Sequence, residues 1–292
     1  MKYYILNINY YNKSRVDYWL ETRGLAPIFY GHSTLSQIGS GIDHNLRPQA
    51  YADARRFVET FKTINKDAVI FSIGDEYVYI YQQKGLLQEI NEKEYENDSI
   101  KYFEIDLLKK IKIKYCPLVL TSIKANRYIQ SGTFRDLNHE RYLGNTRALE
   151  YLIHEKIITV PNYAEYLQCL SSLEFETLIA KYLEEKGLFV PAYKGGFLRN
   201  YDLFCRNTGK VDIILGETII KPGASISVQI KLNFNKDQKN LLDRVDLLFC
   251  IKSDFEDKKV LDWRFLKAHI TSDSVTNTWL KEDLNWVKIR DR

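Results

Sequence analysis

The stretch Ser225-Ile226-Ser227-Val228-Gln229-Ile230-Lys231-Leu232 alternates polar and apolar side chains with the period of two that is typical of a β-strand. Its isoleucine, valine and leucine side chains share one face, which we expect to be buried. Gln229 and Lys231 then lie side by side on the opposite face. An amide oxygen and an ammonium group, joined by a carboxylate from a neighbouring strand, predict a site for metal-assisted phosphodiester cleavage. Oxygen ligands hold a hard divalent cation, and the lysine offsets the charge of the phosphate.

Two aspartates upstream are candidates for that carboxylate. Asp202 lies in the strand-like run Tyr201-Asp202-Leu203-Phe204-Cys205, and Asp212 lies in the similar run Val211-Asp212-Ile213-Ile214. We prefer Asp202, because the glycine pair Gly195-Gly196 precedes it and an apolar run follows it. Glycine lets a backbone approach a phosphate closely. Asp212 stays open as the alternative.

A helix is predicted over residues 172–183, with Ser171 or Ser172 as its cap and Gly187 just beyond its end. Glu176 lies at the border of the apolar stripe of this helix, where its carboxylate can reach over the sheet edge toward a metal ion. The alternative is that Glu174 and Glu176 only stabilise the helix N-terminus through the helix dipole.

These elements, taken in order, resemble the Mrr-type branch of the PD-(D/E)xK nuclease superfamily. The resemblance covers residues 171–255 and rests on Phe175-Glu176, Gly195-Gly196, Asp202 and Gln229-Ile230-Lys231. It implies a restriction-endonuclease-like mixed sheet flanked by helices, and a nuclease that depends on Mg²⁺.

The same resemblance implies a role for each site residue. Asp202 holds the metal ion, together with the Gln229 side chain and the Ile230 carbonyl. Lys231 orients the attacking water and stabilises developing charge, and Glu176 is an auxiliary acid. The cations on either side of the glycine pair are expected to contact the nucleic-acid backbone; they are Lys194 and Arg199.

The N-terminal part of the chain has a different pattern. Strands are predicted over residues 3–8, 68–73, 77–81 and 101–103, with a helix over 48–63 and a hairpin turn at 74–76. This order resembles a PUA-like domain of the EVE kind, which implies a β-barrel-type reader of nucleic acid. Four residues are candidates for contacting the nucleic acid: Trp19, Tyr30, Arg55 and Arg56. For each aromatic residue the alternative is packing in the core.

The chain has 292 residues, which indicates two domains of ordinary size. We expect a mixed α/β and α+β protein with a PUA-like domain over residues 1–140, a helical connector over 141–170 and the nuclease domain over 171–292. The net charge of +4 permits nucleic-acid binding without requiring it. The four cysteines are far apart and no signal peptide precedes the first strand, so we expect a cytoplasmic protein.

Together these features predict a metal-dependent endodeoxyribonuclease of the restriction or antiviral-defence type, acting on plain or modified DNA. A homodimer would make two cuts on opposite strands easiest. Two alternatives stay open. One is a nucleic-acid-binding sensor or assembly subunit that does not cleave, and the near-neutral charge favours it. The other is an RNA nuclease.

Overall fold

The computed structural model describes residues 1–10, 13–14, 16–29, 34–40, 48–91, 99–123, 134–193 and 201–290. The chain divides into two compact units, Met1–Glu155 and Lys156–Arg292. The boundary therefore falls inside the segment 141–170 that we predicted as a connector. Helix α5 (Leu143–His154) packs against the first unit, and β10 (Ile158–Val160) pairs with β18 (Val287–Ile289) in the second.

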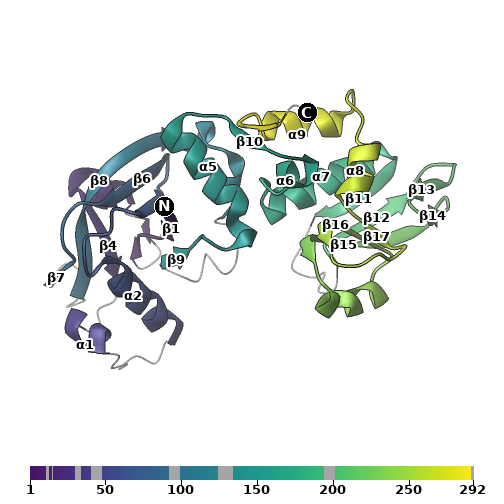
Figure 1. Ribbon diagram of the computed structural model, residues 1–292. Coiled ribbons are helices and arrows are strands. Elements are labelled where there is room, and N and C mark those ends of the chain that lie inside the picture. The colour runs from purple at the N-terminus through teal and green to yellow at the C-terminus, as the bar shows by residue number, and fades with distance from the viewer. Residues whose placement is uncertain are drawn as a thin grey trace. The chain divides into compact units, whose positions relative to one another are not determined.

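The first unit is built on one seven-stranded sheet that curls into a half-barrel (Figure 1). Its main path runs in the order β4-β8-β6-β5-β1-β9, and β7 pairs with β8. The strands are β1 (Lys2–Leu6), β4 (Leu25–Phe29), β5 (Ala68–Ile73), β6 (Tyr77–Gln83), β7 (Gln88–Asn91), β8 (Ser99–Lys112) and β9 (Phe134–Asp136). A separate two-stranded ribbon joins β2 (Asn9–Tyr10) to β3 (Lys13–Ser14).

The hairpin predicted from residues 68–81 is confirmed. Strands β5 and β6 pair antiparallel, and the Gly74 amide donates a hydrogen bond of 2.8 Å to the Tyr77 carbonyl across the turn. Strand β8 is much longer than the pattern at residues 101–103 indicates. Its second half is rich in lysine and pairs with β6 along the whole length of that strand.

Helix α2 (Pro48–Phe61), predicted from the sequence, supplies much of the core of this unit. Phe57 and Phe61 are fully buried and their rings contact Phe103 of β8 and Phe134 of β9. The other helical segments of the unit are η1 (Tyr18–Thr22), α1 (Leu35–Ser40), η3 (Ile113–Tyr115), α3 (Leu118–Ser122) and η5 (Glu140–Tyr142).

The second unit is built on a mixed five-stranded sheet in the order β11-β12-β15-β16-β17. Its strands are β11 (Leu188–Tyr193), β12 (Leu203–Asn207), β15 (Ser225–Phe234), β16 (Leu247–Ser253) and β17 (Val260–Leu261). Strand β12 pairs antiparallel with β11 and with β15, and β16 pairs parallel with β15 and with β17. A small hairpin joins β13 (Ile213–Leu215) to β14 (Thr218–Ile220). The helical segments are α6 (Tyr163–Leu167), α7 (Ser172–Glu185), η6 (Lys236–Asp243), α8 (Trp263–His269) and α9 (Val275–Asp283).

The two faces of this sheet differ, as the alternation in residues 225–232 predicts. One face carries Val228 and Phe249, which lie under α7 and α8; the Phe249 ring contacts Tyr182 of α7 and Phe265 of α8. We call the other one the Gln229 face. By strand register it comprises Phe189, Phe204, Arg206, Ser225, Ser227, Gln229 and Lys231. Leu242 of η6 packs on the same side, against Leu248 and Cys250 of β16.

Helix α7 begins at Ser172, as the sequence predicts, and ends at Glu185, two residues beyond the predicted end. Ser171 forms a capping box: its hydroxyl accepts from the Glu174 amide at 3.2 Å, and the Glu174 carboxylate accepts from the Ser171 amide at 2.7 Å. Gly187 follows the helix with φ of +90°, a conformation that favours glycine. Both ends of the helix are thereby specified by the local sequence.

Candidate functional site

Asp202 lies one residue before β12, beside residues 228–230 of β15. Its amide donates to the Val228 carbonyl at 2.9 Å. Its Oδ2 accepts a hydrogen bond from the Ile230 amide at 2.8 Å and another from the Gln229 side-chain amide. Asp202 is 7% exposed and Gln229 is 5% exposed, so these contacts lie out of bulk water. The Asp202 carboxylate therefore serves as the acceptor for the Ile230 N–H of β15 at the point where β12 begins.

This arrangement brings the Ile230 carbonyl to the same place. In a strand, the N–H and C=O groups of one residue point toward the same neighbouring strand. Because the Ile230 N–H points to Asp202, its carbonyl also points to the side where β12 begins. A carboxylate, a side-chain amide and a backbone carbonyl therefore converge at this point of the sheet.

Lys231 follows directly and belongs to the Gln229 face. Two residues along a strand are about 7 Å apart, so the Lys231 Cα lies about that far from that of Gln229. The Lys231 side chain is half-buried. A long side chain in this position buries its methylene stem and can carry the ammonium group beyond the sheet surface.

The structure does not bring Asp212 to this point. Asp212 is exposed and precedes β13, which pairs with β14 outside the five-stranded sheet. Its neighbour Val211 accepts a hydrogen bond of 2.8 Å through its carbonyl from the Asn207 side chain. Asn207 is the last residue of β12, so Asp212 lies at the end of that strand opposite to Asp202. Of the two predicted acids, the one beside Gln229 and Ile230 is Asp202.

The two glutamates at the start of α7 have different surroundings. Glu174 is 2% exposed, closes the capping box and interacts with Asp283 of α9. Burial and the nearby Asp283 carboxylate raise the pKa of Glu174 to about 8. Glu176 is buried on α7, whereas the hydrogen bonds of Asp202 described above go to β15. The proposed role of Glu176 as auxiliary acid stays a prediction.

The fit to a divalent cation can be judged from the oxygen donors. Within the described part of the chain, no group of three or more His, Cys, Asp or Glu side chains is gathered closely enough to hold a metal ion. The donors beside Asp202 are one carboxylate, one amide oxygen and one carbonyl oxygen, a set that suits Mg²⁺ rather than a softer metal. They fit a hard cation with several water ligands, although Asp202 Oδ2 already accepts two hydrogen bonds.

The nucleic-acid contacts predicted in the first unit need one correction. Trp19 is 0% exposed: its ring packs edge-on against Phe29 and lies under the guanidinium group of Arg23. A ring in this position has no face for a base, because packing in the core covers it, so the structure contradicts the predicted contact.

Arg55 and Arg56 lie exposed on α2, as a phosphate contact requires, and each is paired with an acid. Arg55 forms an ion pair with Glu59 at 2.7 Å, and Arg56 lies 3.9 Å from buried Asp53. Three other predicted contacts, Tyr30, Lys194 and Arg199, lie outside the described residues, as do both glycines of the pair at 195–196.

The sequence interpretation missed two features of this sheet. One is the carboxylate of Asp202 as a hydrogen-bond partner of the Ile230 backbone. The other is the position of Arg206, an exposed cation on the same face as Gln229. The second feature has a signal in the sequence, because Asp202, Phe204 and Arg206 alternate with apolar residues and must share a face if the run is a strand.

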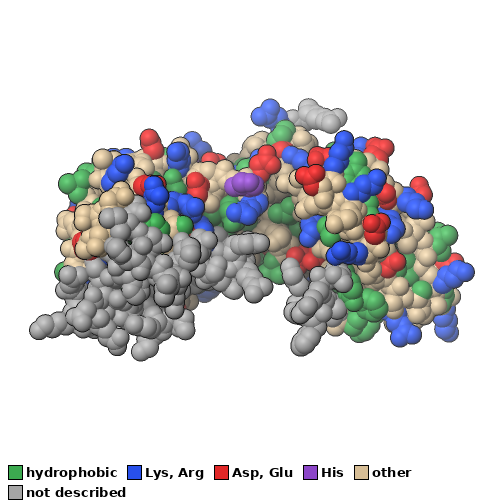
Figure 2. Space-filling model, turned by 90° about the horizontal axis from the view of Figure 1, so that it is seen from below, with side chains coloured by type: hydrophobic (Ala, Val, Ile, Leu, Met, Phe, Trp, Pro, Cys, Tyr) green, Lys and Arg blue, Asp and Glu red, His purple; other side chains and the backbone are tan. Residues whose placement is uncertain are grey.

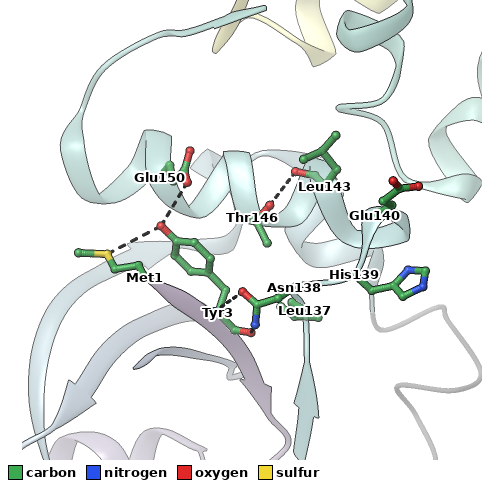
Figure 3. A pocket seen from close by; sticks show the side chains of 9 residues that line it. All are labelled: Met1, Tyr3, Leu137, Asn138, His139, Glu140, Leu143, Thr146 and Glu150. Atoms are coloured by element: carbon green, nitrogen blue, oxygen red, sulfur yellow. Dashed lines mark hydrogen bonds between the residues drawn. The ribbon is translucent and has the colours of Figure 1, made fainter. Parts of the chain in front are cut away.

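The first unit contains a polar cavity of about 300 Å³ between β1, the segment after β9, and α5 (Figure 3). The Tyr3 ring points from β1 toward α5, where its hydroxyl lies 3.5 Å from a carboxylate oxygen of Glu150. Burial and this carboxylate raise the pKa of Tyr3 to about 12. The acids lining the cavity are Glu140 and Glu150. Carboxylates repel phosphate, so this cavity is unsuited to a nucleic-acid backbone.

The surface charges are mixed. On the face seen in Figure 2, Lys and Arg side chains are interspersed with Asp and Glu over the described surface of both units, in keeping with the small net charge. Among the described helices, none is both long and apolar enough to cross a membrane.

Comparisons with known proteins found no relative. No family model matches the chain, and neither the curated proteins nor the solved structures contain a significant match. The function therefore has to be argued from the residues themselves.

Proposed function

We propose that this protein is a metal-dependent endonuclease that hydrolyses DNA phosphodiesters in restriction or antiviral defence, with its chemistry at Asp202, Gln229, Ile230 and Lys231. The observation that carries the proposal is the contact of Asp202 with both Gln229 and Ile230, the two residues that precede the lysine. It supports the resemblance to the Mrr-type branch of the PD-(D/E)xK superfamily, in which those positions form one site.

Each residue has a role that its surroundings support. Asp202, the Gln229 side chain and the Ile230 carbonyl would hold Mg²⁺, which when bound supplies Lewis-acid activation of water and phosphate. Gln229 keeps its carboxamide in place by donating to Asp202. Lys231 offsets the negative charge that develops on the phosphoryl group, and its half-buried stem limits the positions its ammonium group can take.

The first unit would then select the nucleic acid, as the resemblance to a PUA-like domain implies. Its curled sheet is consistent with a barrel-type reader. Two arginines on α2, Arg55 and Arg56, stay candidates for phosphate contacts, since exchanging a surface carboxylate for a phosphate costs little.

A second candidate function is a nucleic-acid-binding subunit that does not cleave. The observation in its favour is that Asp202 Oδ2 is already occupied by two N–H donors, an arrangement that also serves to end the pairing of β12 with β15. In that case the acid is structural, and the lysine contacts a phosphate without supporting chemistry.

A cleavage assay separates the two. Supercoiled plasmid is incubated with the full chain, with and without Mg²⁺, using DNA that carries or lacks modified cytosine, and tRNA is tested in parallel. Mg²⁺-dependent nicking or linearisation of either DNA supports the nuclease. Cleavage of tRNA alone would favour the RNA nuclease, and binding without cleavage of any substrate would favour the non-cleaving subunit.

A further inference from the structure

The Gln229 face carries a second group of residues at its outer edge, away from the residues proposed for catalysis. Phe189 of the edge strand β11 is paired with Arg206 of β12, and Arg206 is paired with Ser225 of β15. Side chains paired in this way lie about 5 Å apart at Cβ and point to the same side of the sheet. Phe204, two residues from Arg206, lies on this side as well.

Phe189 is unusually exposed for a phenylalanine in a strand. It is 56% exposed, whereas its neighbour Leu188, on the opposite face, is 2% exposed. An apolar ring on an open sheet surface loses free energy of burial unless a partner covers it. The ring of Phe204 is half-buried and contacts the ring of Tyr201, so a second aromatic side chain lies on this side of the sheet.

Arg206 supplies a charge next to that ring. It is exposed and, among the residues that the structure describes, has no acid within ion-pair distance. By contrast, Arg55, Arg56 and Arg264 are each paired with a carboxylate. The guanidinium group of Arg206 is therefore available for an anionic partner, and phosphate is the anion that its planar fork matches best.

We propose that Phe189 and Arg206 form a binding platform for single-stranded nucleic acid, with an unstacked base on Phe189 and a phosphate on Arg206. A cation beside an exposed aromatic ring is the combination that recognises single strands, because every base has a face for stacking and every nucleotide has a phosphate. A duplex keeps its bases stacked inside and offers no base to the ring.

The platform is continuous with the proposed catalytic residues. Asp202 precedes β12 by one residue, and Arg206 is four positions further along the chain, or about 13 Å in extended conformation. The Asp202 carboxylate contacts Gln229, which shares a face with Arg206. One bound strand can therefore contact both. This inference rests on the proposed function for its partner, nucleic acid, and it adds that the strand near the catalytic residues is unpaired.

The test measures binding by fluorescence anisotropy of the full chain in EDTA, which prevents Mg²⁺-dependent cleavage. The probes are an oligothymidine of about 12 nucleotides, a length within the range of single-strand sites, and a duplex of the same length. We expect Phe189→Ala to weaken single-strand binding about tenfold and duplex binding less than about twofold. Phe189→Trp should restore single-strand affinity, since it keeps the stacking surface.

Arg206→Ala should weaken binding to both probes. It should also reduce the slope of log Kd against log salt by about one, the change expected for the loss of one phosphate contact. Two exposed residues outside the platform serve as controls. Ile219→Ala removes an apolar side chain that is 60% exposed on β14, and Lys221→Ala removes an exposed cation that follows it. Neither substitution should change affinity for either probe.

Three results would overturn the proposal. They are unchanged single-strand affinity in Phe189→Ala, equal losses for single strand and duplex in that variant, and a change in oligomeric state without a change in affinity. The last would assign the exposed ring to self-association. Plasmid cleavage by the wild-type chain is measured separately, so an inactive protein with an intact platform is distinguishable from an active nuclease without one.

Discussion

The Oδ2 atom of Asp202 lies 2.8 Å from the backbone nitrogen of Ile230 and accepts its hydrogen bond, which places an acid from one strand against the backbone of the next. Gln229, immediately before Ile230, donates its side-chain amide to the same oxygen. The acid and the amide–lysine motif are separated by more than twenty residues in sequence, and these two hydrogen bonds join them.

Asp202 has a structural and a proposed catalytic role, and two substitutions separate them. Asp202→Asn keeps an oxygen that accepts from the Ile230 amide, whereas Asp202→Ala leaves two buried N–H donors without an acceptor. We expect Asp202→Ala to lower the free energy of unfolding by about 1–3 kcal/mol, and Asp202→Asn to lower it by less. Urea unfolding followed by circular dichroism measures both values.

Both Asp202 variants should lose plasmid cleavage, because neither presents a carboxylate. Asp212→Asn is the matched control: the residue is exposed at the other end of β12, so stability and cleavage should be unchanged. Cleavage that survives in Asp202→Asn and disappears in Asp212→Asn would transfer the proposed metal ligand to Asp212.

The pair formed by buried Glu174 and half-buried Asp283 makes the stability of the second unit depend on pH. Burial and the Asp283 carboxylate raise the pKa of Glu174 from 4.5 to about 8, and burial raises that of Asp283. The folded state therefore binds more protons than the unfolded state between these values, and stability falls as pH rises from about 4.5 to about 8.

Glu174→Gln should remove most of this dependence while keeping an oxygen for the Ser171 amide. We expect the melting temperature of the wild-type chain to decrease relative to that of the variant between pH 6 and pH 8, and differential scanning calorimetry at several pH values measures it. Parallel curves for the two proteins over this range would show that the pKa of Glu174 is not raised as described.

Asn207 holds the β13–β14 hairpin to the main sheet. It is 0% exposed, and its side-chain amide donates to the carbonyls of Val211 and Ile220 at 2.8 Å each. Asn207→Ala leaves both carbonyls without this donor, so we expect a loss of about 2 kcal/mol or more in the free energy of unfolding. Asn235→Ala, at an exposed cap position of η6, should cost less and is a suitable comparison. An equal effect of the two substitutions in urea unfolding would contradict this role of Asn207.

The division of the chain at Glu155 leads to a prediction for the first unit alone. A fragment of residues 1–155 keeps α5 with the sheet it packs against, so we expect it to fold cooperatively and to bind nucleic acid without cutting it. Thermal unfolding tests the first statement and a binding titration tests the second. A folded fragment with no affinity for DNA or RNA, plain or modified, would remove the reader role from this unit.

Local patterns in the sequence predicted the elements well where each side chain has one clear environment. The alternation in residues 225–232 predicted β15 and its two faces, and the candidate caps Ser171 and Ser172 predicted the start of α7. Contacts between elements could not be predicted as well from the sequence. The sequence shows that Trp19 is aromatic and that Arg206 is a cation, but only the paired strands and packed helices decide which of these side chains is covered.

Strand β8 illustrates the same limit. Its lysines at positions 109, 110 and 112 interrupt the apolar pattern, so the sequence predicted a strand of three residues where the strand has fourteen. The missing information is non-local: β6 supplies a partner strand, and Glu21 and Glu155 supply partners for the Lys110 and Lys109 ammonium groups.

The central claim is that Lys231 supports cleavage rather than binding alone. The most direct measurement compares Lys231→Ala with the wild-type chain in plasmid cleavage with Mg²⁺ and in DNA binding with EDTA, with Lys210→Ala as an exposed-lysine control. We predict that Lys231→Ala loses cleavage by about a hundredfold or more, the size expected for removal of a charge-stabilising group, while its Kd changes less than about threefold. Cleavage at the wild-type rate in Lys231→Ala, or no cleavage by the wild-type chain, would contradict the account.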